Sequence, residues 1–132
     1  MKGAKILLGI SAVIAFGVGA AMIFATAAFL APQGIPVDDK VAILGQAQGS
    51  LLVGIGVLDL LALRCSDVRG LQAVLGGNLA LQVAGLGVNI HGLAAHIVTQ
   101  QVYGDVVFHV ILGVLFAVFY VRVGKAKAPA AA

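Results

Sequence analysis

Four long apolar segments alternate with short polar segments along this chain of 132 residues. Each apolar segment has about 20 residues or more, which an α-helix needs to cross the roughly 30 Å hydrocarbon layer of a membrane. The pattern predicts an all-α fold, a four-transmembrane-helix antiparallel bundle that makes up a single domain over residues 1–123. The predicted spans cover residues 6–31, 41–63, 70–91 and 103–123.

The segments between these spans contain residues that end helices. Residues 32–40 hold two prolines, a glycine and three charged side chains, and therefore predict an exposed loop. Residues 64–69 form a short connection between the second and third spans, so these two spans should be antiparallel neighbours. Residues 92–102 are apolar enough to prolong the third span or to lie along the membrane surface, and both forms stay open. Residues 124–132 predict a flexible cytoplasmic tail.

Composition strengthens the membrane assignment. Hydrophobic residues make up 61% of the chain and charged residues 10%, whereas soluble domains are about 45–50% apolar. The first span is longer than the core of a usual signal peptide, so we expect it to be retained. The net charge of +3 does not indicate nucleic-acid binding, because the basic residues lie at segment ends and form no stripe with aromatic residues.

The basic residues also predict the orientation of the chain. In a four-span arrangement, seven of the eight lysines and arginines fall on one side of the membrane, and only Lys40 falls on the other. Basic residues concentrate on the cytoplasmic side of membrane proteins with short loops. We therefore expect both termini in the cytoplasm (N-in/C-in) and a multi-pass protein, most simply of a bacterial inner membrane. The single cysteine, Cys65, would then lie in a reducing compartment and has no intrachain partner.

Hydrogen-bonding side chains within the spans fall on particular helix faces. In the third span, Asn78, Gln82 and Asn89 follow helical spacing and form one stripe. In the second span, Gln48 and Asp59 are eleven residues apart, about three turns, and share a face. Polar groups inside a bilayer prefer protein to lipid, so these faces should point inward.

Three polar side chains are expected at one depth. Counting about 1.5 Å per residue from the cytoplasmic end of each span places Gln82 and His109 roughly 20 Å deep and Gln48 roughly 24 Å deep. If the last three spans share a core, these side chains form a polar layer. A Gln82–His109 hydrogen bond is the most specific contact that the sequence predicts.

The fourth span carries one combination with chemical potential. Asp105 and His109 are four residues apart, so the carboxylate can reach the imidazole, as in proton relays and in metal or haem sites. The interpretation that we favour is structural: His109 bonds Gln82, and Asp105 faces water. His91 and His96 lack the spacing of a zinc site, so no metal is predicted. No cofactor is expected, with haem or quinone left as alternatives.

Asp59 is the one acid well inside a span. A charged side chain at the centre of a transmembrane helix costs about 2.5–3.5 kcal/mol, so a partner or a proton is expected. Structural pairing with Arg122, Tyr120 or Arg64 is the favoured interpretation. The alternative is that Asp59 couples proton movement to transport.

Glycines are frequent in the first three spans, where they allow helix backbones to approach closely. Gly45 and Gly49 best match the small-xxx-small spacing of helix contacts. We favour packing within the chain over self-association for this pair.

The function expected from these patterns is not enzymatic, because no catalytic motif stands out. The leading hypothesis is an accessory, structural or assembly subunit that lies in lipid and packs against other membrane subunits or against itself. One alternative is a protein that binds quinone, lipid or haem, or that handles protons. A second alternative is a proton-coupled exporter that uses Asp59. The candidate residues for a ligand or proton site are Gln48, Asn78, Gln82, Asn89, Asp105 and His109.

Overall fold

The chain folds into helices. The computed structural model describes residues 1–126, and in this part it contains no strand. Four helices are long and apolar enough to cross a membrane, which confirms the predicted all-helical fold and the number of span-length helices in this part of the chain. They are α1 (Lys2–Phe24), α3 (Asp39–Ala62), α4 (Val68–Ala94) and α5 (Tyr103–Lys125). The predicted tail falls largely on residues 127–132, which lie outside the described residues.

Aspartates define where two of the long helices begin. The side chain of Asp38 accepts a hydrogen bond of 2.8 Å from the backbone N–H of Val41, and that of Asp67 accepts one of 2.6 Å from Gly70. Such caps satisfy N–H groups that the first helical turn leaves free. Helices α3 and α4 therefore begin two residues earlier than the hydropathy pattern predicts, and α4 and α5 also continue two to three residues further.

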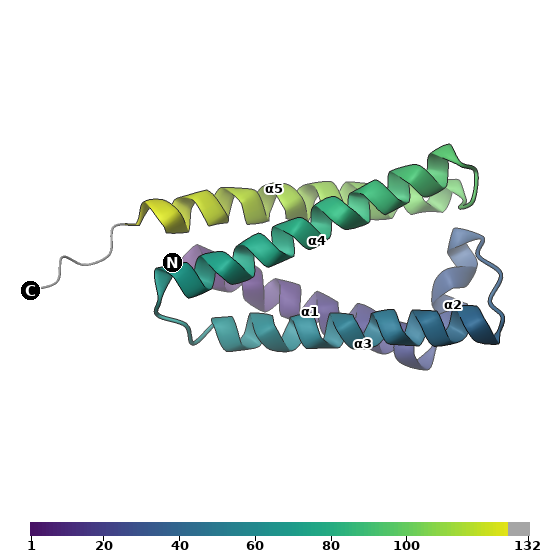
Figure 1. Cartoon of the computed structure of the whole chain (residues 1–132), viewed down its shortest axis with the longest axis horizontal. Helices are drawn as coiled ribbons and strands as arrows, with labels where there is room; N and C mark the ends of the chain where they lie inside the picture. Colours follow the sequence, from purple (N-terminus) through teal and green to yellow (C-terminus); the bar gives the residue numbers. More distant parts are fainter. Residues whose placement is uncertain (127–132) are drawn as a thin grey trace, which may run out of the picture.

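The prediction of one continuous helix over residues 6–31 is wrong. Helix α1 ends at Phe24, and Ala25 leaves helical geometry with φ −141° and ψ 39°. The short helix α2 (Thr26–Leu30) and the 3₁₀ turn η1 (Ala31–Gln33) follow in another direction (Figure 1). The Thr26 hydroxyl donates a 2.5 Å hydrogen bond to the carbonyl of Met22, a contact that bends helices.

The long helices form two antiparallel pairs, α1 with α3 and α4 with α5 (Figure 1). The expectation that α3 and α4 are close neighbours holds only in part. They run antiparallel and are joined by a short turn, but each makes most of its contacts with its own pair partner. The two pairs meet mainly near the end that carries the N-terminus and the α3–α4 turn, which we call the basic end because Lys2, Arg64 and Arg122 lie there.

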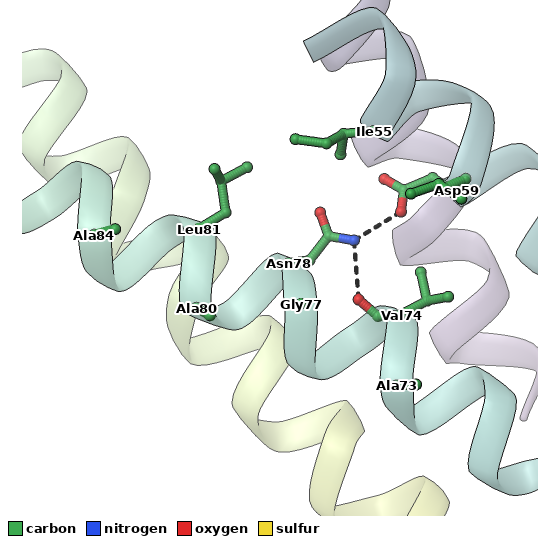
Figure 2. A pocket seen from close by; sticks show the side chains of 10 residues that line it. Ile55, Asp59, Ala73, Val74, Gly77, Asn78, Ala80, Leu81 and Ala84 are labelled. Atoms are coloured by element: carbon green, nitrogen blue, oxygen red, sulfur yellow. Dashed lines mark hydrogen bonds between the residues drawn. The ribbon is translucent and has the colours of Figure 1, made fainter. Parts of the chain in front are cut away.

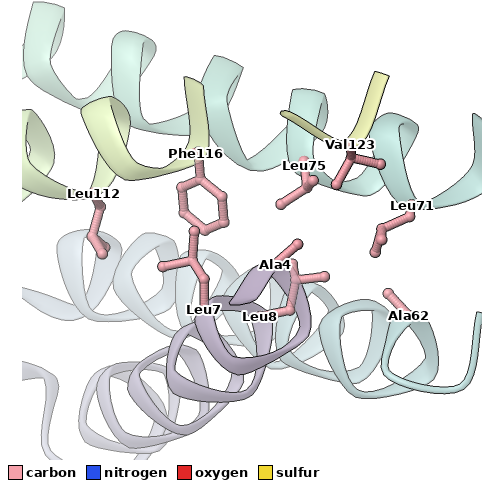
Figure 3. Close-up of a cluster of buried hydrophobic side chains, with 9 residues drawn as sticks. All are labelled: Ala4, Leu7, Leu8, Ala62, Leu71, Leu75, Leu112, Phe116 and Val123. Carbon is pink, nitrogen blue, oxygen red and sulfur yellow. The ribbon is translucent and has the colours of Figure 1, made fainter. Parts of the chain in front are cut away.

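A cluster of buried apolar side chains joins the two pairs at the basic end (Figure 3). All four long helices contribute to it, and Leu8 and Phe116 are fully buried at its centre. In lipid, close van der Waals contact rather than water exclusion makes such a cluster stabilising. Its members are Ala4, Leu7, Leu8, Ala62, Leu71, Leu75, Leu112, Phe116 and Val123.

Glycines let α1 and α3 approach to backbone contact. A Cβ atom at Gly49 would lie 2.7 Å from the carbonyl oxygen of Gly19, and one at Gly19 would lie 2.8 Å from that of Gly49. Gly45 faces the side chain of Thr26, and Gly56 faces Phe16. The small-xxx-small pair of α3 therefore packs within the chain, as we favoured from the sequence.

The opposite end of the molecule is joined by loop contacts. The Thr99 hydroxyl donates to the carbonyl of Pro32, and the Thr99 N–H donates to that of Gln33, each at 3.0 Å. Gly34, with φ 74°, adopts the left-handed conformation that this close approach requires. Residues 95–102 form a turn and the 3₁₀ element η2 (Gln100–Val102), so they do not prolong α4 as a helix.

The α1–α3 contact predicts opposite outcomes for two Gly→Ala substitutions on α3. Alanine favours a helix over glycine by about 1 kcal/mol, and at Gly54, where nothing lies within 4 Å of the added methyl group, stability should stay equal or rise. At Gly49 the methyl group meets the α1 backbone, so the free energy of unfolding should fall by about 1–3 kcal/mol. Unfolding in mixed micelles with rising SDS measures both. Equal effects would contradict the close backbone contact.

Candidate functional site

A pocket of about 610 Å³ lies between α3 and α4 (Figure 2). We call it the α3–α4 pocket. It exists because the two helices belong to different pairs and are not packed along their full length. Its walls are apolar except where Asp59 and Asn78 meet (Figure 2). The lining residues are Ile55, Leu58 and Asp59 from α3, with Ala73, Val74, Gly77, Asn78, Ala80, Leu81 and Ala84 from α4.

Asp59 and Asn78 form the one buried hydrogen bond between side chains of α3 and α4 in residues 1–126. The Asn78 amide Nδ2 donates to Asp59 Oδ1 at 2.7 Å and to the Val74 carbonyl at 3.1 Å. The Asp59 side chain is fully buried, and Asn78 is 5% exposed. The Ser11 hydroxyl, buried on α1, lies beside the same carboxyl group. Three helices thus surround Asp59.

The predicted partners of Asp59 are corrected by this geometry. Tyr120 packs its ring against Gly76, and the Arg122 guanidinium lies 5.9 Å from the centre of the Phe119 ring. Arg64 is exposed in the turn after α3. The partner is an amide rather than a cation, because the face of α4 that meets Asp59 carries Asn78.

Two oxygens of this pair have no hydrogen-bond partner within the described chain. They are Asp59 Oδ2 and Asn78 Oδ1, both buried. Figure 2 shows the second Asp59 oxygen and the Asn78 oxygen on the same side of the hydrogen bond, the side on which Ile55 lies. A buried acceptor without a donor costs about 1–3 kcal/mol, so an unpaired couple is unusual in a folded protein.

The predicted hydrogen bond between α4 and α5 is confirmed. His109 Nδ1 lies 2.6 Å from Gln82 Oε1. Gly85 makes room for the ring, since a Cβ atom there would lie 2.7 Å from His109 Cε1. This contact lies within one helix pair and links its two members through polar groups.

The proposed combination of Asp105 with His109 is not assembled. The Nδ1 atom of His109 faces Gln82, and Asp105 Oδ2 accepts a hydrogen bond of 3.5 Å from Gln33. Asp105 thus joins α5 to the loop at the opposite end. This geometry agrees with the structural interpretation of His109.

The predicted polar layer is only partly formed. Gln48 is exposed on α3, and Asn89 is half-buried near the opposite end of α4. The layer required the last three spans to share a core, whereas α3 packs mainly on α1. Gln82 and His109 therefore meet without Gln48.

Sequence reasoning singled out Asp59 and Asn78 separately and missed both their pairing and Ser11. A serine in an apolar helix is too common to stand out. The one available signal was that both side chains lie on the expected inward faces of consecutive spans.

Neither a metal-ligand cluster nor a known relative helps to identify the function of this site. No group of three or more His, Cys, Asp or Glu side chains in residues 1–126 is placed to hold a metal ion. Comparison with protein-family models, with characterised proteins and with solved structures finds no match. Function therefore has to be inferred from the geometry of the chain.

The Gln82–His109 contact predicts a measurable coupling. Gln82→Met, His109→Leu and the double variant should give a coupling free energy of about 0.6–1.7 kcal/mol, the range of hydrogen bonds between transmembrane helices. The SDS-induced unfolding of each variant measures it. His91, which is exposed on α4, supplies the control, because Gln82→Met and His91→Leu should be additive. Additivity of the first pair would contradict the hydrogen bond.

Proposed function

We propose that this chain is a non-enzymatic membrane-protein subunit. It works by packing against other transmembrane helices, and its main partner is a second copy of itself. The observation that carries the proposal is the open wall of the α3–α4 pocket. Four small residues of α4 are exposed there: Ala73, Gly77, Ala80 and Ala84. Small residues on an exposed helix face allow another helix backbone to approach closely, which is the main source of helix association in lipid.

Gln48 supports a second copy as the partner. It lies seven residues before Ile55 and eleven before Asp59, so it continues the face of α3 that lines the pocket. Its exposed amide prefers a hydrogen-bonding partner to hydrocarbon. An amide carries both donors and an acceptor, so two Gln48 side chains related by a two-fold axis can satisfy each other.

The orientation belongs to the same proposal. The N-terminus, the α3–α4 turn and the C-terminal end of α5 lie at the basic end (Figure 1), and the excess of Lys and Arg there supports a cytoplasmic location. The α2 and η2 end would then face the other side of the membrane.

Cys65 tests this orientation without an added tag. It is the only cysteine and lies half-buried in the α3–α4 turn. A membrane-impermeant maleimide should leave intact cells unlabelled and should label the protein once the cells are permeabilised. The variant Cys65→Ser with Lys40→Cys, which moves the thiol to the opposite end, should show labelling in intact cells. The reverse pattern would contradict the orientation.

Self-association is tested by energy transfer between labelled copies in lipid vesicles. Gln48→Leu removes the amide, and Gly77→Leu fills the exposed wall of α4, so each should raise the dissociation constant about fivefold or more, the equivalent of about 1 kcal/mol. Gly17→Leu is the matched control, because Gly17 also has open space around it and lies on α1, which does not line the pocket. A monomer in vesicles would overturn the second-copy proposal, and so would a different protein or a lipid purified in the pocket.

A further inference from the structure

The two unpaired oxygens where Asp59 and Asn78 meet in the α3–α4 pocket require a donor. Asp59 Oδ2 and Asn78 Oδ1 are both buried, and neither accepts a hydrogen bond from residues 1–126, although the Ser11 hydroxyl lies beside the Asp59 carboxyl group. Both atoms are shielded from solvent, so an outside ligand cannot reach them without opening the site. Both are acceptors when Asp59 is a carboxylate, and two facing acceptors repel each other.

A single proton satisfies both atoms. On Oδ2 of Asp59 it converts that oxygen into a donor, and the unpaired acceptor on the same side of the existing hydrogen bond is the amide oxygen of Asn78 (Figure 2). The Asn78 amide already donates to Asp59 Oδ1 at 2.7 Å. The two side chains then form a reciprocal acid–amide pair with two parallel hydrogen bonds, and no buried acceptor of the pair is left over.

We propose that Asp59 is a proton-binding site, and that the neutral acid and Asn78 form a reciprocal pair that ties α3 to α4. This inference is independent of the proposed self-association, since it concerns contacts within one chain.

The surroundings support a neutral acid. Ser11 from α1 and Asn78 from α4 are the polar side chains beside Asp59, and neither is charged. The remaining side chains of the pocket lining are apolar. A carboxylate there would be a buried charge without a cation, which is the arrangement that proteins avoid most strongly.

The proton has a mechanical consequence because α3 and α4 belong to different helix pairs. They make few contacts with each other beyond the basic end, so the Asp59–Asn78 pair is a polar link between the α1/α3 and α4/α5 pairs. Loss of the proton would leave two facing acceptors and weaken this link. If folding takes up a proton at Asp59, the linkage relation requires that stability falls as pH rises.

Infrared spectroscopy of the protein in lipid tests the proposal directly. Near neutral pH, we expect the carbonyl-stretching band of one protonated carboxylic acid, which Asp59→Asn removes while the other four acidic residues stay unchanged. If Asp59→Asn does not fold, Asn78→Leu assigns the band instead, because loss of the hydrogen bond to the acid carbonyl shifts it to higher frequency. Absence of a protonated-acid band near neutral pH would overturn the proposal.

Stability against pH provides the second readout. The wild-type ratio of folded to unfolded protein should fall as pH rises above about 4, the ordinary pKa of an aspartate, by up to about tenfold for each pH unit over which folded Asp59 keeps its proton. Asp59→Asn is the matched variant, since an asparagine carries the donor permanently and can form the same reciprocal pair with Asn78. Its ratio should change less than about twofold over the same range. Equal pH dependence of the two proteins would overturn the proposal.

Discussion

The structure depends on the rule that a polar group in hydrocarbon must find its partner inside the protein. The four apolar helices satisfy the hydrogen bonds of their own backbone. The few polar side chains in the spans therefore specify which helix faces meet. Asn78 meets Asp59, and Gln82 meets His109. Each of these contacts joins two helices at a defined place, whereas the surrounding apolar side chains would tolerate many alternative packings.

Small residues decide how closely the helices approach. Gly19 and Gly49 bring α1 and α3 to backbone contact, and Gly85 provides the space that His109 occupies between α4 and α5. The result is two tight pairs that share a cluster of buried side chains near the basic end. Because the pairs are not packed along their full length, a pocket remains between α3 and α4. Its wall of small residues and its polar end are the parts of the molecule without an obvious structural partner, and both proposals start from them.

The two proposals depend on different residues of the α3–α4 pocket. Self-association uses the exposed wall of α4 and the amide of Gln48, which lie open in a single chain. Proton binding uses Asp59 and Asn78, which are buried by their own chain. A dimer without a protonated acid, or a protonated acid in a monomer, would therefore separate them.

Local properties of the chain were enough to predict the helices and their inward faces. The length of each apolar run predicts a span, the positions of Lys and Arg predict an orientation, and helical spacing groups Asn78 and Gln82 on one face. The Gln82–His109 hydrogen bond could also be predicted, because two neighbouring spans placed these side chains at similar depths. Each of these inferences depends on neighbours along the chain or on simple counting along a straight helix.

Which polar side chains contact one another depends on how the helices cross, and no local sequence pattern predicts the crossing. Asp59 meets Asn78 although no spacing along either span pairs them, and depth counting on straight spans placed Gln48 in a polar layer that the pairing of α3 with α1 prevents. The break at Ala25 coincides with a hydrogen bond from the Thr26 hydroxyl to the preceding turn, a contact that hydropathy cannot register. Hydropathy and charge describe how each helix meets lipid and water, but contacts between helices depend on shapes matched across the full set of spans.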